Sequence, residues 1–201
     1  MHLRVTIAAR GQHLAAKKEI VGGAMRKFIF SVFAVLSLSA TAAHAAIFPS
    51  VVKSLDLSSY AGKWYQVAST NPFFQKDCVC ATATYTLQTD GNINVVNTCR
   101  KGTVDGELSS VEGVAYPTSK VGKLNVVFGG VRLPFSNYWV IEVAEDYSYA
   151  VVSSPLRTPI WVLSRTPSLP NETLAGIYSR LEAAGFPIGS IKPTLQEGCV
   201  D

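Results

Sequence analysis

After position 44 the chain contains no histidine. Its three histidines are His2, His13 and His44, and all of them fall in a segment that resembles a secretion leader. The remaining residues can therefore supply neither Ser-His-Asp nor Cys-His catalysis, nor an imidazole ligand for a metal ion. They also show no other catalytic constellation. We expect a protein that is not an enzyme and that has no metal site and no cofactor.

Beyond residue 45 the chain also lacks an excess of positive charge. Six of its 18 Lys and Arg residues lie in the first 45 positions, together with one of its 14 acidic residues, which leaves 12 basic and 13 acidic side chains. This balance gives no electrostatic footprint for nucleic acid or for an anionic membrane. The same part of the chain has no repeat and no low-complexity linker, so residues 46–201 are expected to form one domain.

Residues 1–45 have the features of a leader that contains a secretory signal peptide. Met25-Arg26-Lys27 is a short positive region, residues 28–40 are an apolar run, and Ala43-His44-Ala45 is a small-x-small cleavage site. The apolar run is too short for a transmembrane helix. Met25 is the expected start of translation. No cysteine stands directly after the apolar run, so no bacterial lipid anchor is expected. The mature protein is predicted to be secreted or periplasmic.

The four cysteines are Cys78, Cys80, Cys99 and Cys199. An even number of cysteines behind a secretion signal predicts two disulfides, for which three pairings exist. A Cys-x-Cys metal or redox site is the alternative, but the sequence lacks a second pair at metal-ligand spacing.

The mature chain is a series of short β-rich runs separated by turn signals. Between Ala81 and Leu87 apolar residues and threonine alternate strictly, as expected for a strand with one buried face. Eight such runs are predicted, at 64–69, 80–88, 93–99, 109–116, 123–128, 138–143, 149–153 and 160–164. One helix with an apolar stripe follows, between Pro170 and Gly185. This order predicts an all-β, up-and-down antiparallel barrel with the helix packed outside; a β-sandwich is the alternative from the pattern alone.

Three motifs occur in a fixed order along these predicted strands. They are Gly62-Lys63-Trp64-Tyr65, then Asp146-Tyr147, then the string from Trp161 to Pro167. Together they resemble the lipocalins over nearly the whole mature chain, and most of all the branch of bacterial lipocalins and apolipoprotein D.

The resemblance implies which residues stabilise the fold. In lipocalins the first-strand tryptophan plugs the closed end of the barrel, and the arginine after the last strand lies across its ring. The structural motif residues here are Gly62, Trp64, Asp146, Tyr147 and Arg165.

A disulfide pairing is also implied by the resemblance. Cys80 aligns with the second-strand cysteine that, in apolipoprotein D and the insect bilin-binding lipocalins, bonds to the C-terminal tail. The resemblance therefore predicts a Cys80–Cys199 disulfide, and the two remaining cysteines would form a Cys78–Cys99 disulfide.

Ligand contacts are expected at inward positions and at the mouth of the barrel. Alternation places Tyr85, Phe128 and Trp139 on inward faces, and Phe73 in a loop that would rim the mouth. The predicted function is that of a carrier for one small hydrophobic molecule, with an acyl chain as first choice. The alternatives are a lipocalin-type isomerase that uses a cavity thiol, and a protein-binding lipocalin that acts as an inhibitor or pigment-complex subunit. A homodimer is compatible with each.

Overall fold

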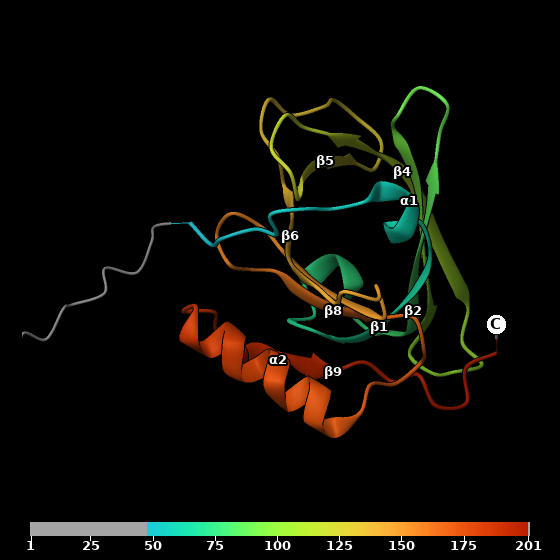
Figure 1. Cartoon of the computed structure of the whole chain (residues 1–201). Coiled ribbons are helices and arrows are strands. Elements are labelled where there is room, and N and C mark those ends of the chain that lie inside the picture. Colours follow the sequence, from blue (N-terminus) through green and yellow to red (C-terminus); the bar gives the residue numbers. More distant parts are fainter. Residues whose placement is uncertain (1–47, 201) are drawn as a thin grey trace, which may run out of the picture. The chain divides into compact units, whose positions relative to one another are not determined.

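Eight antiparallel strands close into a barrel in residues 48–200, the part of the chain that this computed structural model describes (Figure 1). The strands are β1 (Gly62–Ser69), β2 (Cys78–Leu87), β3 (Ile93–Lys101), β4 (Leu108–Pro117), β5 (Lys123–Val127), β6 (Tyr138–Val143), β7 (Tyr149–Ser153) and β8 (Ile160–Ser164). Each strand pairs with the next, and β1 pairs with both β2 and β8, which closes the barrel. The predicted barrel is therefore confirmed, and the β-sandwich alternative is wrong.

The leader, the Met25 start and the cleavage site predicted from the sequence lie outside the described residues. Among residues 48–200 no helix is long and apolar enough to cross a membrane.

The barrel interior is filled at one end by large apolar side chains. Tyr60, Trp64, Ile93 and Val140 are almost fully buried there and form one cluster with Leu124. The short helix α1 (Leu57–Tyr60) covers this end, and the Asp56 carboxylate caps it by accepting a hydrogen bond from the Ser58 amide at 2.9 Å. This end of the barrel is closed.

The N-terminal segment crosses the closed end on its way to α1 (Figure 1). The Val52 amide donates a hydrogen bond to the Val140 carbonyl at 3.0 Å, and Val52, Leu55 and Leu57 pack on the interior cluster. Because apolar side chains cover this end, any opening to solvent must lie at the other end.

Helix α2 (Asn171–Ala183) lies outside the barrel, along β1 and β8 (Figure 1). Ile177 and Leu181 are its buried residues, and they pack on Val151 and Val162, which point outward from β7 and β8. These strands are thus covered on both faces, which explains why both are apolar runs without clear alternation. The helix ends before Gly185, whose φ of +76° is a conformation that glycine adopts readily.

The C-terminal tail runs along the outside of the barrel and is bonded to it. A two-residue strand that the sequence analysis did not predict, β9 (Lys192–Pro193), pairs with the end of β1. Farther on, the Cys80 amide donates to the Leu195 carbonyl at 2.8 Å, and a disulfide joins Cys80 to Cys199. The second disulfide joins Cys78 to Cys99, so the structure has the pairing that the resemblance implies.

A β-bulge in β6 changes which of its side chains face inward. The register of β6 against β7 shifts between Val140 and Glu142, so that Val140 and Val143 both pack on the interior cluster although they are three residues apart. If side chains alternated strictly along β6, Trp139 would face the barrel interior, as Val143 does. The bulge makes this prediction wrong: Tyr138 lines the cavity and Trp139 does not.

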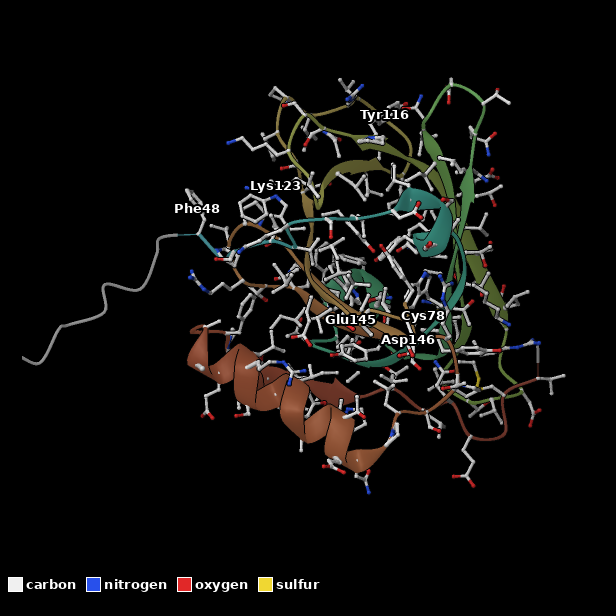
Figure 2. All side chains as sticks on the ribbon, in the orientation of Figure 1. Phe48, Cys78, Tyr116, Lys123, Glu145 and Asp146 are labelled. Atoms are coloured by element: carbon white, nitrogen blue, oxygen red, sulfur yellow. A yellow bond between two sulfur atoms is a disulfide. The ribbon has the colours of Figure 1, made fainter. Side chains whose placement is uncertain are left out.

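Trp139 lies instead on the outer side of the wall, where other side chains cover it. The Lys123 ammonium group is 3.3 Å from its ring centroid, and the Phe48 ring centroid is 6.1 Å away. Figure 2 labels Phe48 and Lys123, the two residues that contact the Trp139 ring. Trp139 is therefore buried, with 6% of its surface exposed, without facing the interior.

Candidate ligand-binding cavity

A cavity of about 660 Å³ occupies the barrel above the closed end. Each of the eight strands contributes at least one lining residue, and the loop with the 3₁₀ turn η1 (Phe73–Gln75) lies at the mouth. The apolar and aromatic lining consists of Phe74, Ala83, Tyr85, Val95, Val111, Val126, Phe128, Tyr138, Val152, Pro159, Trp161 and Leu163. Its volume and its mainly apolar lining are typical of sites for small molecules.

Two of the four predicted ligand-contact residues line this cavity. Tyr85 and Phe128 do so, while Trp139 does not, for the reason given above. Phe73 is 89% exposed and packs edge-on against Phe74, which is the member of this pair that lines the cavity. Of the two phenylalanines on this loop, Phe74 is therefore the one that lines the cavity.

Phe128 can lie against the wall because residue 113 is a glycine. A side-chain Cβ at Gly113 would lie 2.7 Å from Cδ1 of the Phe128 ring and 2.4 Å from the Val127 carbonyl oxygen. Both distances are shorter than carbon atoms tolerate, so any larger residue at this position would displace β5 or the Phe128 ring.

Sequence reasoning missed Trp161 as a cavity residue, because it was counted only as part of a family motif. Its Nε1 donates to Oε1 of Gln75 at 2.7 Å, and the Phe74 ring centroid lies 6.4 Å from its own. Gln75 in turn donates from Nε2 to Oε1 of Gln66 at 3.1 Å. These bonds hold the mouth loop against β1 and β8. Period-two alternation from Leu163 would have identified Trp161.

Three tyrosine hydroxyls meet at the floor of the cavity, and we call them the tyrosine triad. Tyr85 and Tyr138 line the cavity, whereas Tyr60 belongs to the packed cluster below it. The hydroxyl of Tyr138 lies 2.6 Å from that of Tyr60 and 2.9 Å from that of Tyr85. Burial raises the pKa of Tyr85 to about 12, and it raises the pKa of Tyr60 and of Tyr138 well above the ordinary value. All three are therefore neutral at physiological pH.

Several polar side chains also line the cavity, and two of them, both on β3, bear on ligand binding. Asn97 lies on β3, and its buried Oδ1 accepts no hydrogen bond from the described residues. Lys101 lies at the mouth end of the same strand, where its exposed ammonium group is 3.6 Å from Sγ of Cys78. The cavity thus combines an apolar body with a neutral polar floor and one positive charge at its opening.

Arg165 contacts the closed end from the outside of the barrel. Its guanidinium carbon is 3.7 Å from the centroid of the Trp64 ring. Its Nη2 donates to the carbonyls of Ser59 and Ala61 at 2.7 and 2.8 Å, and its Nη1 donates to that of Lys63 at 2.8 Å. The arginine therefore joins the end of α1 to the start of β1, on the far side of Trp64 from the cavity.

The other motif residues lie at the same end and also make structural contacts. Gly62 has a φ of +98°, and a Cβ there would lie 3.3 Å from Nη1 of Arg165. The Tyr147 hydroxyl accepts a hydrogen bond from the Asp56 amide at 2.9 Å, and Oδ1 of Asp146 accepts one from the Ser148 amide at 3.0 Å. Asp146 is labelled in Figure 2. None of the motif residues at this end lines the cavity.

No group of three or more His, Cys, Asp and Glu side chains among residues 48–200 is placed to hold a metal ion. All four cysteines are in disulfides, including Cys78 and Cys99, which line the mouth of the cavity. The cavity therefore presents no thiol.

Comparison with known proteins gives one consistent family. A model of the lipocalin-like domain matches residues 55–196. Temperature-induced lipocalin-1 of Arabidopsis thaliana is 36% identical over 157 residues, which is 73% of this chain and 82% of that protein. The outer membrane lipoprotein Blc of Citrobacter freundii is 35% identical over 153 residues, 74% of this chain and 83% of that protein.

Solved structures show the same fold. Apocrustacyanin C1 superposes with a TM-score of 0.58 at 20% sequence identity, covering 71% of this chain and 81% of its own. At this identity the similarity concerns the fold alone. With the ordered motifs, the closed barrel and the matching relatives all in agreement, this chain belongs to the lipocalin family, whose barrels bind small hydrophobic molecules.

Proposed function

We propose that this protein is a secreted or periplasmic carrier that binds one long-chain lipid, such as a fatty acid or a lysophospholipid, inside the barrel. The observation that carries the proposal is the cavity of about 660 Å³, lined mainly by apolar and aromatic side chains and closed at one end by Trp64. Such a cavity gains affinity by removing apolar surface from water, about 25 cal/mol per Å² before ordering costs.

Lys101 supports the choice of a lipid with one polar end. Its ammonium group is the one positive charge among the residues that line the cavity, and it lies at the mouth. A fatty acid would place its tail in the barrel and its carboxylate near this charge, where both remain in contact with water. Buried apolar area together with this pairing is expected to give a Kd on the order of micromolar or tighter.

Binding of an acyl ligand to the delipidated protein tests the proposal through tryptophan fluorescence. Of the three tryptophans, Trp161 lines the cavity, Trp64 lies under its floor and Trp139 lies outside the wall. Titration with palmitate or with a fluorescent acyl probe should therefore change the emission of Trp161. Trp161→Phe should remove most of that change, while the matched variant Trp139→Phe should retain it.

Two results would contradict the proposal. One is that the folded, delipidated protein binds no acyl or sterol probe at concentrations up to the solubility limit. The other is that Trp139→Phe, rather than Trp161→Phe, removes the ligand-dependent signal, because the ligand would then lie outside the barrel.

The isomerase alternative requires a cavity thiolate, and a disulfide bond occupies both cysteines that line the cavity, Cys78 and Cys99. Quantification of free thiols in the unfolded, non-reduced protein tests this point. Detection of a free thiol would support the isomerase alternative.

A protein-binding lipocalin remains the second candidate function, and exposed apolar side chains beside the mouth favour it. Phe73 is 89% exposed, Phe74 58% and Leu156 77%, and all three lie in loops at the open end. Exposed apolar groups of this kind often mark interaction surfaces. If every lipid probe fails while these side chains prove necessary for self-association or for binding another protein, this second function is supported.

A further inference from the structure

The floor of the cavity has one more hydroxyl hydrogen than the tyrosine triad itself can use. The tyrosine triad contains three hydroxyl hydrogens, but its oxygens are joined by two contacts, Tyr60 to Tyr138 and Tyr138 to Tyr85. Each contact uses one hydrogen. Whichever way the hydroxyls are oriented, one O–H is left without an acceptor within the triad.

The spare hydrogen can face the cavity, because two of the three hydroxyl groups belong to residues that line it. Tyr85 and Tyr138 are lining residues, whereas Tyr60 is 1% exposed and belongs to the packed cluster below. A spare hydrogen on Tyr60 would be buried among apolar side chains, which is costly. The favoured orientations therefore have Tyr60 donating to Tyr138, and the free O–H is on Tyr138 or Tyr85.

Burial restricts which ligand groups can accept a hydrogen bond from this hydroxyl. The raised pKa values of the triad show that negative charge is disfavoured at this depth. A buried carboxylate would meet the same penalty. A neutral oxygen, in a hydroxyl or a carbonyl group, can accept the hydrogen bond without bringing charge to the floor.

Asn97 adds a second unsatisfied polar group on the same wall. It pairs with Ala83 across the β2–β3 ladder, two residues closer to the mouth than the pair of Tyr85 and Val95. Two residues correspond to about 7 Å along a strand. Asn97 thus lies one such step from the level of Tyr85 toward the mouth, and within residues 48–200 its Oδ1 accepts no hydrogen bond.

We propose that the cavity selects a ligand whose inner, buried end carries a neutral oxygen, a hydroxyl or a carbonyl, which accepts a hydrogen bond from the tyrosine triad. This inference rests on the proposed carrier function and narrows its ligand class from simple acyl chains to chains or ring systems oxygenated at the end remote from their polar head. Six residue steps separate Val95, at the level of Tyr85, from Lys101 at the mouth, about 20 Å along the strand. A long, doubly polar molecule suits that span.

The test compares two acids that differ at one end. The Kd values of hexadecanoic acid and 16-hydroxyhexadecanoic acid are measured by competition against the same fluorescent acyl probe. In a purely apolar cavity the terminal hydroxyl weakens binding, because it loses its hydrogen bonds to water. In this protein the hydroxy acid should bind at least as tightly as the plain acid, and about tenfold more tightly if one full hydrogen bond is gained.

A double variant separates the triad from the rest of the cavity. Tyr85→Phe with Tyr138→Phe removes both hydroxyls that line the floor, so the preference for the hydroxy acid, measured as the ratio of the two Kd values, should fall by about tenfold or more. Tyr178→Phe is the matched control. Tyr178 lies on α2 and packs against the apolar cluster outside the barrel, so this variant should leave the Kd values of both acids unchanged. If the double variant does not fold, the comparison of the two acids in the wild-type protein still tests the inference, because weaker binding of the hydroxy acid contradicts it.

The outcomes distinguish this inference from the function on which it rests. Weaker binding of the hydroxy acid by the wild-type protein, or an unchanged preference in the folded double variant, overturns the inference and leaves the carrier function in place. Failure of both acids to bind the folded, delipidated protein overturns the carrier function and the inference with it.

Discussion

Replacing Arg165 with alanine should destabilise the protein strongly without removing its ligand binding. The guanidinium group of Arg165 stacks on Trp64 at 3.7 Å and donates hydrogen bonds of 2.7–2.8 Å to the carbonyls of Ser59, Ala61 and Lys63. The substitution removes all of these contacts together and uncovers one face of a fully buried tryptophan. It does not touch the cavity, from which Arg165 is separated by Trp64.

The magnitude follows from these contacts. A cation–π contact of this kind contributes about 0.5–2 kcal/mol. Hydrogen bonds to a charged donor contribute about 1.5–3 kcal/mol each when buried, but Arg165 is half-buried, so water replaces part of what the three carbonyls lose. A total of about 2–4 kcal/mol is expected, which for a domain of this size lowers Tm by roughly 5–15 °C.

Chemical denaturation followed by tryptophan fluorescence measures this loss, and Arg180→Ala is the control. Arg180 forms an ion pair with Glu142 at 2.6 Å, but its side chain is 53% exposed, so its removal should cost less than about 1 kcal/mol. Arg165→Lys should recover only part of the lost stability, because an ammonium group cannot reach several carbonyls at once.

Two results would refute this reasoning. If Arg165→Ala costs no more than Arg180→Ala, the contacts at the closed end are not stabilising. If ligand binding disappears while the free energy of unfolding is unchanged, Arg165 belongs to the binding site and the closed end has been assigned wrongly.

Two further predictions concern stability. Replacing Cys80 and Cys199 with serine opens a bond between residues 119 positions apart and should cost at most about 4–5 kcal/mol, whereas removing the Cys78–Cys99 bond, which spans 21 positions, should cost about 1–2 kcal/mol less; equal losses in denaturant unfolding would contradict the loop-length argument. The tyrosine triad should make the protein sensitive to alkali, because burial raises the pKa of Tyr85 from its ordinary value of 10.0 to about 12. The unfolded state releases this proton first, so the stabilisation is complete below pH 10 and is lost as pH rises from 10 to 12. The free energy of unfolding should fall more steeply over this range in the wild type than in the double tyrosine-to-phenylalanine variant, and parallel curves would refute the argument.

The sequence by itself determined the fold, because the signals for it are local and repeated. The alternating residues on β2 and the start and stop signals of α2 each specify an element from its own neighbourhood. Eight such runs joined by short connections leave few topologies besides a closed barrel. The family motifs then indicated that Trp64 and Arg165 lie together at the closed end.

The tertiary structure alone decided the composition of the cavity. The bulge in β6 moves Trp139 outside and Tyr138 inside, and a bulge depends on how two strands pair, which a single strand does not encode. The tyrosine triad arises in the same way, since its members come from α1, β2 and β6 and lie far apart in the sequence. Alternation within a strand predicts which residues share a face; only the closure of the barrel determines which hydroxyl groups meet inside it.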